Sequence, residues 1–452
     1  MRQVLISGLD TTQPGLVNRN LLLSPGDPLS QIQMAETQRR LYDLGVFARV
    51  NMAIQNPEGE TANKYVLYQM EEAKKYSITS GLGAELARIG GARGSLEDPG
   101  GRAGFAPRVS LDVSRRNLLG RGHVASFRSR LSTLQRRALV NYSAPRLGNI
   151  AGLNLSFTAL YDDSTDVRTF SAIRREGSVQ LSQRLSKADT ALYRFSYRRV
   201  SVGSLAIDPL LVPQLAQPAR IGMLSGNLIG DRRDDPTDAR KGAYNTLDLG
   251  FASRIFGSQA DFTRALARNS SYHALSKRLV LARSINFGWL YPISFRVGET
   301  RTREIPLAER LFSGGAGSHR GFPENQAGPR DLTTGFPLGG RALLMNNTEI
   351  RFPVAGDNLS GVLFHDAGNV YSALEKISFR VRQRDLNDFD YMVHAMGLGV
   401  RYRTPIGPVR LDLAYSINSP QFKGCTGTTT CGAPTEQRIS RFQFHFSIGQ
   451  AF

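Results

Sequence analysis

The chain has 452 residues and a formal net charge of +19 at pH 7, and it contains 45 glycines and two cysteines. No run of about 18 apolar residues occurs, so no transmembrane helix can be read from the sequence. Its 49 arginines (57 basic residues less eight lysines) are spread along alternating segments and form no blocks, which argues against nucleic acid as a partner. They suit polar interior and loop surfaces, or an exterior that faces anionic lipid headgroups.

The first 74 residues are predicted to form a small α+β domain with the order strand, helix, helix, strand, strand. Asp27 is expected to cap the second helix, and Gly45 to end it. Strand 64–71 is expected at an edge of the sheet, where it could hold an extended client or partner protein by strand addition. The alternative is that the domain is a structural spacer. The strands are expected at 3–8, 46–55 and 64–71, and the helices at 13–22 and 28–44.

The remainder of the chain alternates apolar and polar residues with period two. In the last strand, Phe442 and Phe444 point one way and Gln443 the other. Strands with one apolar and one polar face are typical of a transmembrane β-barrel. We expect sixteen of them, at 75–87, 106–117, 121–131, 136–144, 151–161, 169–185, 189–200, 219–231, 243–254, 260–271, 278–290, 341–353, 361–371, 393–403, 408–417 and 440–449.

The connections between these strands differ in length on the two sides. Turns after even-numbered strands are short, as at 118–120, and the turn at 231–242 is a longer exception with four aspartates. Bacterial barrels keep short turns in the periplasm and long loops outside, so the domain that precedes the first strand is expected in the periplasm. The long loops are at 88–105, 201–218, 291–340, 372–392 and 418–439.

Four short sequence motifs lie one after another in the last third of the chain, and the first of them contains Arg320-Gly321-Phe322. This order resembles the outer-membrane protein assembly factor superfamily (the BamA/TamA-like bacterial surface antigen family), and the N-terminal part resembles a single POTRA domain. The resemblance spans the whole chain. It implies an all-β transmembrane barrel of 16 antiparallel strands at 75–452, preceded by a POTRA-like α+β domain (β-α-α-β-β) at 1–74. The motifs lie at 314–322, 347–353, 364–370 and 442–452, with further similarity at 40–47, 231–236 and 397–408.

In this superfamily the long loop, here 291–340, folds back into the barrel lumen. The resemblance implies that Arg320, Gly321 and Phe322 anchor it to Glu349 and Asp366 on the inner wall. An arginine can engage carboxylates through planar paired hydrogen bonds, and two carboxylates against one cation call for another donor nearby. The alternative is that these are ordinary solvated charges of the lumen. One departure is His319, where relatives usually carry a small apolar residue.

The resemblance also draws attention to the join between the first and last strands. Gly81 and Gly83 weaken the interior of the first strand, and Gly449 stands near the terminal Phe452, where relatives often kink. These strands are expected to pair poorly, so that the barrel can open sideways along a lateral seam. The Arg320 anchor is expected to brace the wall opposite this seam.

Cys425 and Cys431 stand six residues apart in one loop, and they suit a disulfide in an oxidising exterior, with two free thiols as the alternative. Neither they nor the aspartates of the 231–242 turn show the ligand order of a metal site. The six histidines are scattered without a partner at catalytic spacing. We therefore expect no metal, no cofactor and no enzymatic activity.

The resemblance implies a factor that folds client β-barrels into the bacterial outer membrane without ATP. A two-partner-type secretion pore is the alternative, and a passive porin ranks last because it needs neither the POTRA-like domain nor the arginine loop. The expected partners are nascent outer-membrane β-barrel proteins, outer-membrane lipids, and accessory lipoproteins or an inner-membrane-anchored periplasmic protein. No leader precedes the first strand, so either upstream sequence was removed or the chain is a fragment.

Overall fold

The computed structural model describes residues 2–55, 64–89, 96–150, 152–297, 300–356, 358–404, 407–427 and 431–448. Its N-terminal elements follow the predicted order, and they form a three-stranded sheet with the strand order β1-β3-β2. Helix α2 buries Met34 and Leu41 in one core with side chains of the sheet such as Val50 and Val66. The elements are β1 (Gln3–Ser7), α1 (Pro14–Asn18), α2 (Gln31–Tyr42), β2 (Phe47–Gln55) and β3 (Tyr65–Glu72).

The start of helix α2 differs from the prediction. Ser30 is the N-cap, and its hydroxyl accepts a hydrogen bond from the Gln33 N–H at 3.4 Å. Asp27 does not cap the helix, because its carboxylate accepts a hydrogen bond from the Ser24 N–H at 2.8 Å in the preceding turn. Gly45 follows the end of the helix in a left-handed conformation (φ +68°), which glycine adopts without steric cost.

Strand β3 is the central strand of this sheet. It pairs in parallel with β1, from Gln3 opposite Tyr65 to Ser7 opposite Gln69, and antiparallel with β2 on its other side. The prediction that 64–71 forms an edge is therefore wrong, because the hairpin of β2 and β3 places β3 against the parallel strand β1. Both sides of its backbone are engaged, so β3 has no free edge for strand addition.

Glu72, at the end of β3, holds the segment that follows β1. Its carboxylate accepts hydrogen bonds from the backbone N–H groups of Asp10 (3.2 Å), Thr11 (2.9 Å) and Thr12 (2.6 Å), and from the Thr11 hydroxyl. Burial opposes ionisation of this group, but the hydrogen bonds from Thr11 and Thr12 outweigh burial and lower the pKa of Glu72 to about 2.

We expect Glu72→Gln to loosen this segment at neutral pH by about 1 kcal/mol, since the carboxylate is partly exposed to water. A depressed pKa stabilises the fold above the unfolded value of 4.5, and this contribution is lost as the pH falls toward 2. Once corrected for intrinsic exchange rates, hydrogen exchange of the Thr11 and Thr12 amides should therefore accelerate on acidification in the parent. In the variant it should be fast at every pH.

Glu71→Gln is the control, because that carboxylate is 65% exposed and lies 3.9 Å from Arg49. Equal effects of the two substitutions would contradict the assignment.

The prediction of sixteen antiparallel barrel strands is confirmed. They close into one ring in chain order, in which the last strand, β22, lies between β19 and the first strand, β4. The strands are β4 (Tyr76–Ile89), β5 (Arg102–Leu118), β6 (His123–Ser132), β7 (Gln135–Ala144), β8 (Leu153–Ser164), β9 (Ser171–Arg184), β10 (Asp189–Gly203), β11 (Ala219–Asp231), β12 (Gly242–Ala252), β13 (Ala260–Ala274), β14 (Val280–Val297), β16 (Ala342–Ala355), β17 (Leu359–Tyr371), β18 (Val393–Thr404), β19 (Gly407–Ser416) and β22 (Phe442–Ile448).

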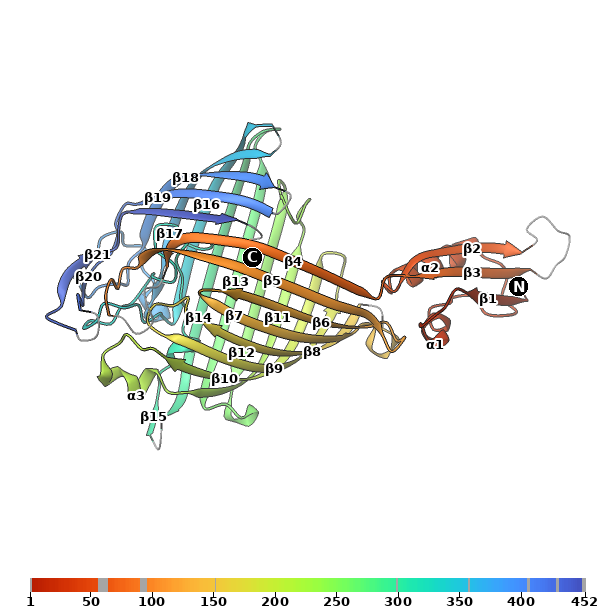
Figure 1. The fold of residues 1–452 in the computed structure, drawn as a ribbon, viewed down its shortest axis with the longest axis horizontal. Helices are drawn as coiled ribbons and strands as arrows, with labels where there is room; N and C mark the ends of the chain where they lie inside the picture. Colours follow the sequence, from red (N-terminus) through yellow and green to blue (C-terminus); the bar gives the residue numbers. More distant parts are fainter. Residues whose placement is uncertain are drawn as a thin grey trace.

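The two ends of the barrel carry different structures. The N-terminal domain extends from one end, and the smaller elements of the long loops lie at the other (Figure 1). Strand β15 (Thr300–Thr302) extends β14, β20 (Gln421–Gly424) pairs with β21 (Thr435–Arg438), and α3 spans Val212–Leu215. Short 3₁₀ turns lie at Leu147–Asn149, Pro209–Leu211, Arg254–Phe256, Leu307–Glu309 and Leu374–Lys376.

Side-chain exposure follows the alternation of the sequence. On β4, Leu82 is 75% exposed on the outer face. On β22, Phe442 is 63% exposed, whereas Gln443 and His445 are buried toward the lumen. This exposed apolar face of the strands is the kind of surface that meets lipid. Among the described residues, no helix has the length and apolar character needed to cross a membrane.

The N-terminal domain touches the barrel at the turn between β5 and β6. The Gln13 N–H donates to the Gly120 carbonyl (2.9 Å), and the Asn117 amide donates to the Thr12 hydroxyl (2.8 Å). A Cβ atom at Gly120 would lie 2.2 Å from the carbonyl oxygen of Thr11, and Gly120 has a φ of +70°. Only glycine fits this approach, so the turn is shaped to receive the segment between β1 and α1.

Candidate functional site in the barrel lumen

The segment that joins β14 to β16 meets the inner wall of the barrel, and Arg320 forms a buried ion pair with that wall. The Arg320 Nε and Nη2 atoms donate to the two carboxylate oxygens of Asp366, on β17, at 2.8 and 2.7 Å. The Nη1 atom donates to Glu349, on β16, at 2.7 Å. The side chains of Arg320 and Asp366 are 4% and 0% exposed, so this is a buried, bidentate ion pair.

The local fold gives Arg320 a third contact with the same carboxylate. Its backbone N–H donates to Asp366 Oδ2 at 2.9 Å, so the loop backbone is fixed together with the side chain. The guanidinium also lies 3.5 Å from the ring centroid of Phe364, two residues earlier on β17. Phe364 and Asp366 are two residues apart on one strand, so both side chains point into the lumen. This alternation explains why the guanidinium contacts both of them.

Further donors and acceptors balance the charge of the site. Asp412, on β19, lies 3.9 Å from Arg320 Nη1 and 2.7 Å from Arg401. Arg351 donates to Glu349 at 2.9 Å, and the Asn347 amide donates to Asp366 at 2.9 Å. Three carboxylates thus meet three guanidinium groups, which limits the cost of burying the ions. Arg351 and Arg401 are the additional cations that charge balance requires, and Asn347 adds a neutral hydrogen-bond donor.

Gly321 and Phe322 fix the loop on the other side of Arg320. A Cβ atom at Gly321 would lie 2.6 Å from the Cβ of Ala395, so the loop backbone lies directly against β18. Phe322 is fully buried in a cluster with side chains of the wall and neighbouring loops, including Val393 and Phe422. The three residues therefore place an ion pair, a close backbone approach and an apolar contact side by side.

His319 packs as a neutral ring. Its Nδ1 atom accepts a hydrogen bond from the Gly321 N–H at 3.2 Å, so its Nε2 carries the proton and donates to the Val393 carbonyl at 3.0 Å. The ring meets Phe322 edge to face, with centroids 4.9 Å apart. Both ring nitrogens are satisfied, and His319 fills space in the buried loop as the departure from the small apolar residue usual in the superfamily.

The loop also contacts the closing strand itself. His445, on β22, lies with its Nε2 atom 3.0 Å from the Arg320 carbonyl oxygen, and its side chain is buried. The expectation that this anchor braces the wall opposite the seam is therefore wrong. The register of β19 with β22 places Asp412 opposite His445, so the arginine site extends across the wall to the strand that borders the seam.

A second buried ion pair holds the loop to the far wall. Arg198, on β10, donates to both carboxylate oxygens of Glu309 at 2.9 and 2.5 Å, and each side chain is 6% exposed. In the order of the ring, β10 lies half a turn from β19. The loop is thus tied to opposite sides of the lumen. No pattern in the sequence indicates this pair, whose members stand 111 residues apart.

Asp412 could have been found from the sequence. It lies between Leu411 and Leu413, which alternation places on the lipid face, so its carboxylate had to face the lumen. The resemblance drew attention only to the arginine motif and the two earlier acidic strands. A search for carboxylates on the lumenal face of each late strand would have added Asp412.

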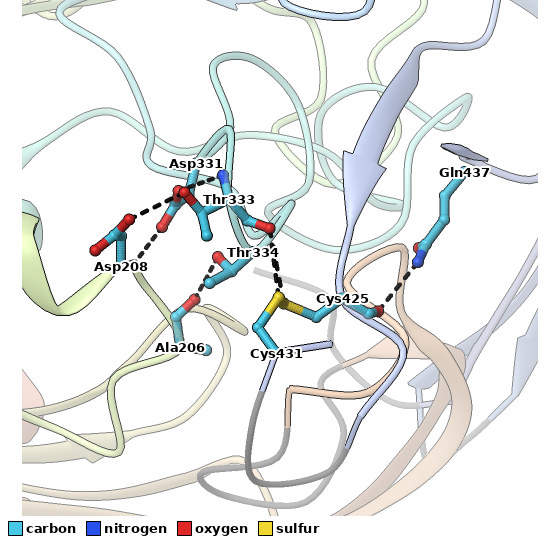
Figure 2. The surroundings of a disulfide bond; sticks show 8 residues. All are labelled: Ala206, Asp208, Asp331, Thr333, Thr334, Cys425, Cys431 and Gln437. Atoms are coloured by element: carbon cyan, nitrogen blue, oxygen red, sulfur yellow. Dashed lines mark hydrogen bonds between the residues drawn. A yellow bond between two sulfur atoms is a disulfide. The ribbon is translucent and has the colours of Figure 1, made fainter. Parts of the chain in front are cut away.

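Cys425 and Cys431 form a disulfide (Figure 2). Cys425 directly follows β20, which lies at the end of the barrel away from the N-terminal domain (Figure 1). Their sulfur atoms lie 3.7 and 3.6 Å from the Thr333 carbonyl oxygen, as contacts and not hydrogen bonds, because a disulfide has no S–H. The Cys425 N–H donates to the Thr334 carbonyl at 3.2 Å. Thr334 in turn donates to the Ala206 carbonyl at 2.9 Å. Three loops that are distant in sequence are therefore joined over the lumen.

The seam between β22 and β4 is short within the described residues. Its ladder runs from Ile448 opposite Ala84 to Phe446 opposite Leu86. Neither strand stops there, since β22 begins at Phe442 and β4 continues to residue 89, yet no further pairing joins their described parts. By contrast, β4 pairs with β5 over its whole length.

The structure describes two of the four residues that were predicted to belong to the seam. Gly81 and Gly83 lie within β4, opposite Ser110 and Arg108 of β5. Gly449 and Phe452 lie outside the described residues. The short ladder is therefore a property of the described part of β22, from Phe442 to Ile448.

The described parts of the chain contain no group of three or more His, Cys, Asp or Glu side chains arranged to hold a metal ion. The aspartates of the 232–241 turn have structural roles. Asp234 accepts hydrogen bonds from three backbone N–H groups, including that of Arg240 at 2.9 Å, and Asp235 accepts one from Thr237 at 2.7 Å. These contacts shape the turn.

Comparison with known proteins places these features in a family context. A family model described as the Omp85 superfamily domain matches residues 117–452. Among curated relatives, the outer membrane protein assembly factor BamA of Nitratidesulfovibrio vulgaris is 22% identical, over 100% of this chain and 51% of the relative. BamA of Neorickettsia risticii is 22% identical over 92% of this chain and 52% of the relative. The chain spans about half the length of the curated relatives it matches.

Solved structures show the same fold. BamA from Haemophilus ducreyi lacking POTRA domains 1-3 matches with a TM-score of 0.73 and 17% identity, over 99% of this chain and 84% of that chain. CdiB from Acinetobacter baumannii matches with a TM-score of 0.53 and 12% identity, over 99% of this chain and 73% of that chain. At these identities the matches establish the architecture of the barrel with its preceding domain.

Proposed function

Because the chain belongs to the Omp85 superfamily, we propose that this outer-membrane barrel is an assembly factor that folds client β-barrel proteins into the membrane through its seam. In this proposal the N-terminal domain stands in the periplasm, where clients arrive. Accessory lipoproteins or an inner-membrane-anchored protein are the partners that such a domain would meet. The observation that carries the proposal lies in the described part of the seam, where the ladder ends at Phe446 and the residues of β22 from Phe442 to His445 have no partner on β4.

A short seam suits assembly for a physical reason. An opened seam offers unpaired N–H and C=O groups to a client strand, which can pair before it meets lipid. Bare backbone groups in hydrocarbon cost several kcal/mol each, so a template that supplies partners lowers the barrier to insertion. No ATP is required, because insertion of a finished barrel is itself downhill.

The anchored loop argues against the alternative of a secretion pore. A polypeptide-exporting pore needs a free path through the lumen. Here the loop is tied to two distant strands of the wall, β17 and β10, by the buried pairs of Arg320 with Asp366 and of Arg198 with Glu309. A client that folds at the seam has no need of the lumen, so the loop can stay in place during assembly.

The direct test is client folding in vesicles. An unfolded outer-membrane barrel should become resistant to protease at least about tenfold faster in vesicles with this protein than in vesicles with an unrelated closed barrel, a difference of ~1.4 kcal/mol in the barrier. A soluble polypeptide added outside should not enter the vesicles. Equal folding rates in both preparations would refute assembly, and uptake of the soluble polypeptide would favour the secretion pore.

A further inference from the structure

A cavity of about 950 Å³ lies between helix α1 of the N-terminal domain and the barrel rim formed by the ends of β5 to β10. Four arginines line it: Arg19 from the C-terminal end of α1, and Arg121, Arg146 and Arg184 from three neighbouring turns or strand ends. The one carboxylate in the lining is Asp43. The cavity is therefore strongly basic, and its size is that of a small-molecule site.

Three of these arginines have no carboxylate partner among the described residues. Arg19, Arg121 and Arg184 form no ion pair there, whereas Arg351 and Arg401 on the late strands do. Arg146 is held differently, since its guanidinium donates to the Asn20 side chain and lies 3.5 Å from the Arg40 carbonyl. One arginine thus fixes the domain to the rim, and three are left to meet an anion.

The turns that supply two of these arginines also carry exposed leucines close by in the sequence. Leu119 is 72% exposed two residues before Arg121, and Leu185 is 55% exposed directly after Arg184. Exposed leucines beside arginines suit the interface between membrane and water. There the aliphatic groups reach the acyl chains of the lipid while the guanidinium groups meet its phosphate. A site for a soluble anion has no use for the leucines.

We propose that this cavity binds the headgroup of an anionic phospholipid, with its phosphate between α1 and the three turns. Guanidinium groups suit phosphate because their planar donors match its oxygens. The surplus of arginines over Asp43 favours a headgroup with net negative charge over a zwitterionic one. A bound lipid then joins the N-terminal domain to the rim of the barrel, beyond what the direct hydrogen bonds provide. This inference does not depend on the assembly function.

The test uses the full chain in a non-ionic detergent, titrated with dioctanoyl phosphatidylglycerol. Arg121→Gln combined with Arg184→Gln should weaken binding by about tenfold or more, from the contribution of basic residues to anionic lipid binding. The matched control is Lys277→Gln combined with Arg278→Gln, in the turn between β13 and β14. That turn also carries the exposed Leu275 but does not line the cavity. The control should stay within about twofold of the parent.

Each arm has a result that overturns the proposal. An equal loss in the control pair would mean a general attraction of turn cations to lipid. Equal binding of dioctanoyl phosphatidylcholine would remove the selectivity for net charge, and displacement by inorganic phosphate at the same concentration would indicate a site for a free anion. Displacement by an acidic peptide at the same concentration would assign the cavity to a polypeptide. A heat-induced shift in electrophoretic mobility confirms that the barrel of every variant is folded.

Discussion

Arg320→Ala is expected to free the loop between β14 and β16 from the wall while the sixteen strands stay formed. The substitution leaves Asp366 and Glu349 without the guanidinium that both engage. Removing one partner of a buried pair costs ~3–5 kcal/mol, enough to raise the open population of the loop about a hundredfold or more. A wet lumen would reduce this cost, but the burial of both Arg320 and Asp366 leaves little room for screening.

The loop should then be cut faster by protease, and client assembly should fall. The lipid-facing side chains are untouched, so the variant should still enter the membrane and show the heat-induced mobility shift of a folded barrel. Arg320→Lys should restore assembly only in part, because an ammonium cannot keep the paired contacts with Asp366 and Glu349. It also loses the planar contact with the Phe364 ring.

A second arginine of the same loop provides the matched control. Arg310 donates to Glu304 at 2.8 Å and to the Ile305 carbonyl at 3.2 Å, so both of its partners lie within the loop. Arg310→Ala should loosen the loop locally without freeing it from the barrel wall. Full assembly activity in Arg320→Ala, with the protease resistance of the parent, would show that this residue is not the anchor.

The strands could be predicted from the sequence because each buries one face against the lumen and exposes the other to lipid. Alternation in β22 fixed which side chains point outward, as with Phe442 and Gln443. The strand ends were less certain. Strand β14 runs to Val297, beyond the predicted end at residue 290, because it continues as a hairpin with β15. Pairing outside the membrane needs no apolar face, so it leaves no periodic signal.

The arginine site was predictable only in part. The resemblance named Arg320, Glu349 and Asp366, and alternation supported the inward direction of Glu349. The meeting of Arg198 with Glu309 could not be foreseen, because it depends on how far the strands tilt when the ring closes. The contact of His445 with the Arg320 carbonyl depends on the same closure.

The N-terminal domain shows a different limit. Its order of elements was correct, but the position of β3 in the sheet was not. Sequence order suggests that the last strand lies at an edge, whereas the parallel pairing of β1 with β3 places it in the centre. Such pairing joins residues such as Leu5 and Leu67 across two helices. Local patterns carry no information about contacts at that separation.

Locking the seam is expected to stop client assembly while the barrel stays intact. Leu86 and Phe446 are directly opposite in the ladder between β4 and β22. Opposite residues of antiparallel strands have Cβ atoms ~4.5–5.5 Å apart, and a small adjustment brings two cysteines to the ~3.8 Å that a disulfide needs. If clients pair with an opened seam, the combined variant Leu86→Cys and Phe446→Cys should lose assembly when oxidised and recover it when reduced.

The control lock joins two strands that should never separate. Leu413 of β19 and Phe444 of β22 are also direct partners, and each is 41% exposed on the outer face. Leu413→Cys combined with Phe444→Cys should keep the parental rate when oxidised. Reductant also opens the native bond between Cys425 and Cys431, so the parent must be measured with and without reductant.

The size of the expected loss of assembly follows from the number of client backbone groups that lose their hydrogen-bond partners. A client strand that finds no open partner must enter lipid with unpaired N–H and C=O groups, each costing several kcal/mol. Since ~1.4 kcal/mol changes a rate tenfold, even a partial loss of template pairing should slow assembly at least about tenfold. Electrophoresis with and without reductant measures how much of the seam is locked. If fully oxidised seam-locked protein folds clients at the rate of the Leu413–Phe444 control, assembly does not pass through this seam.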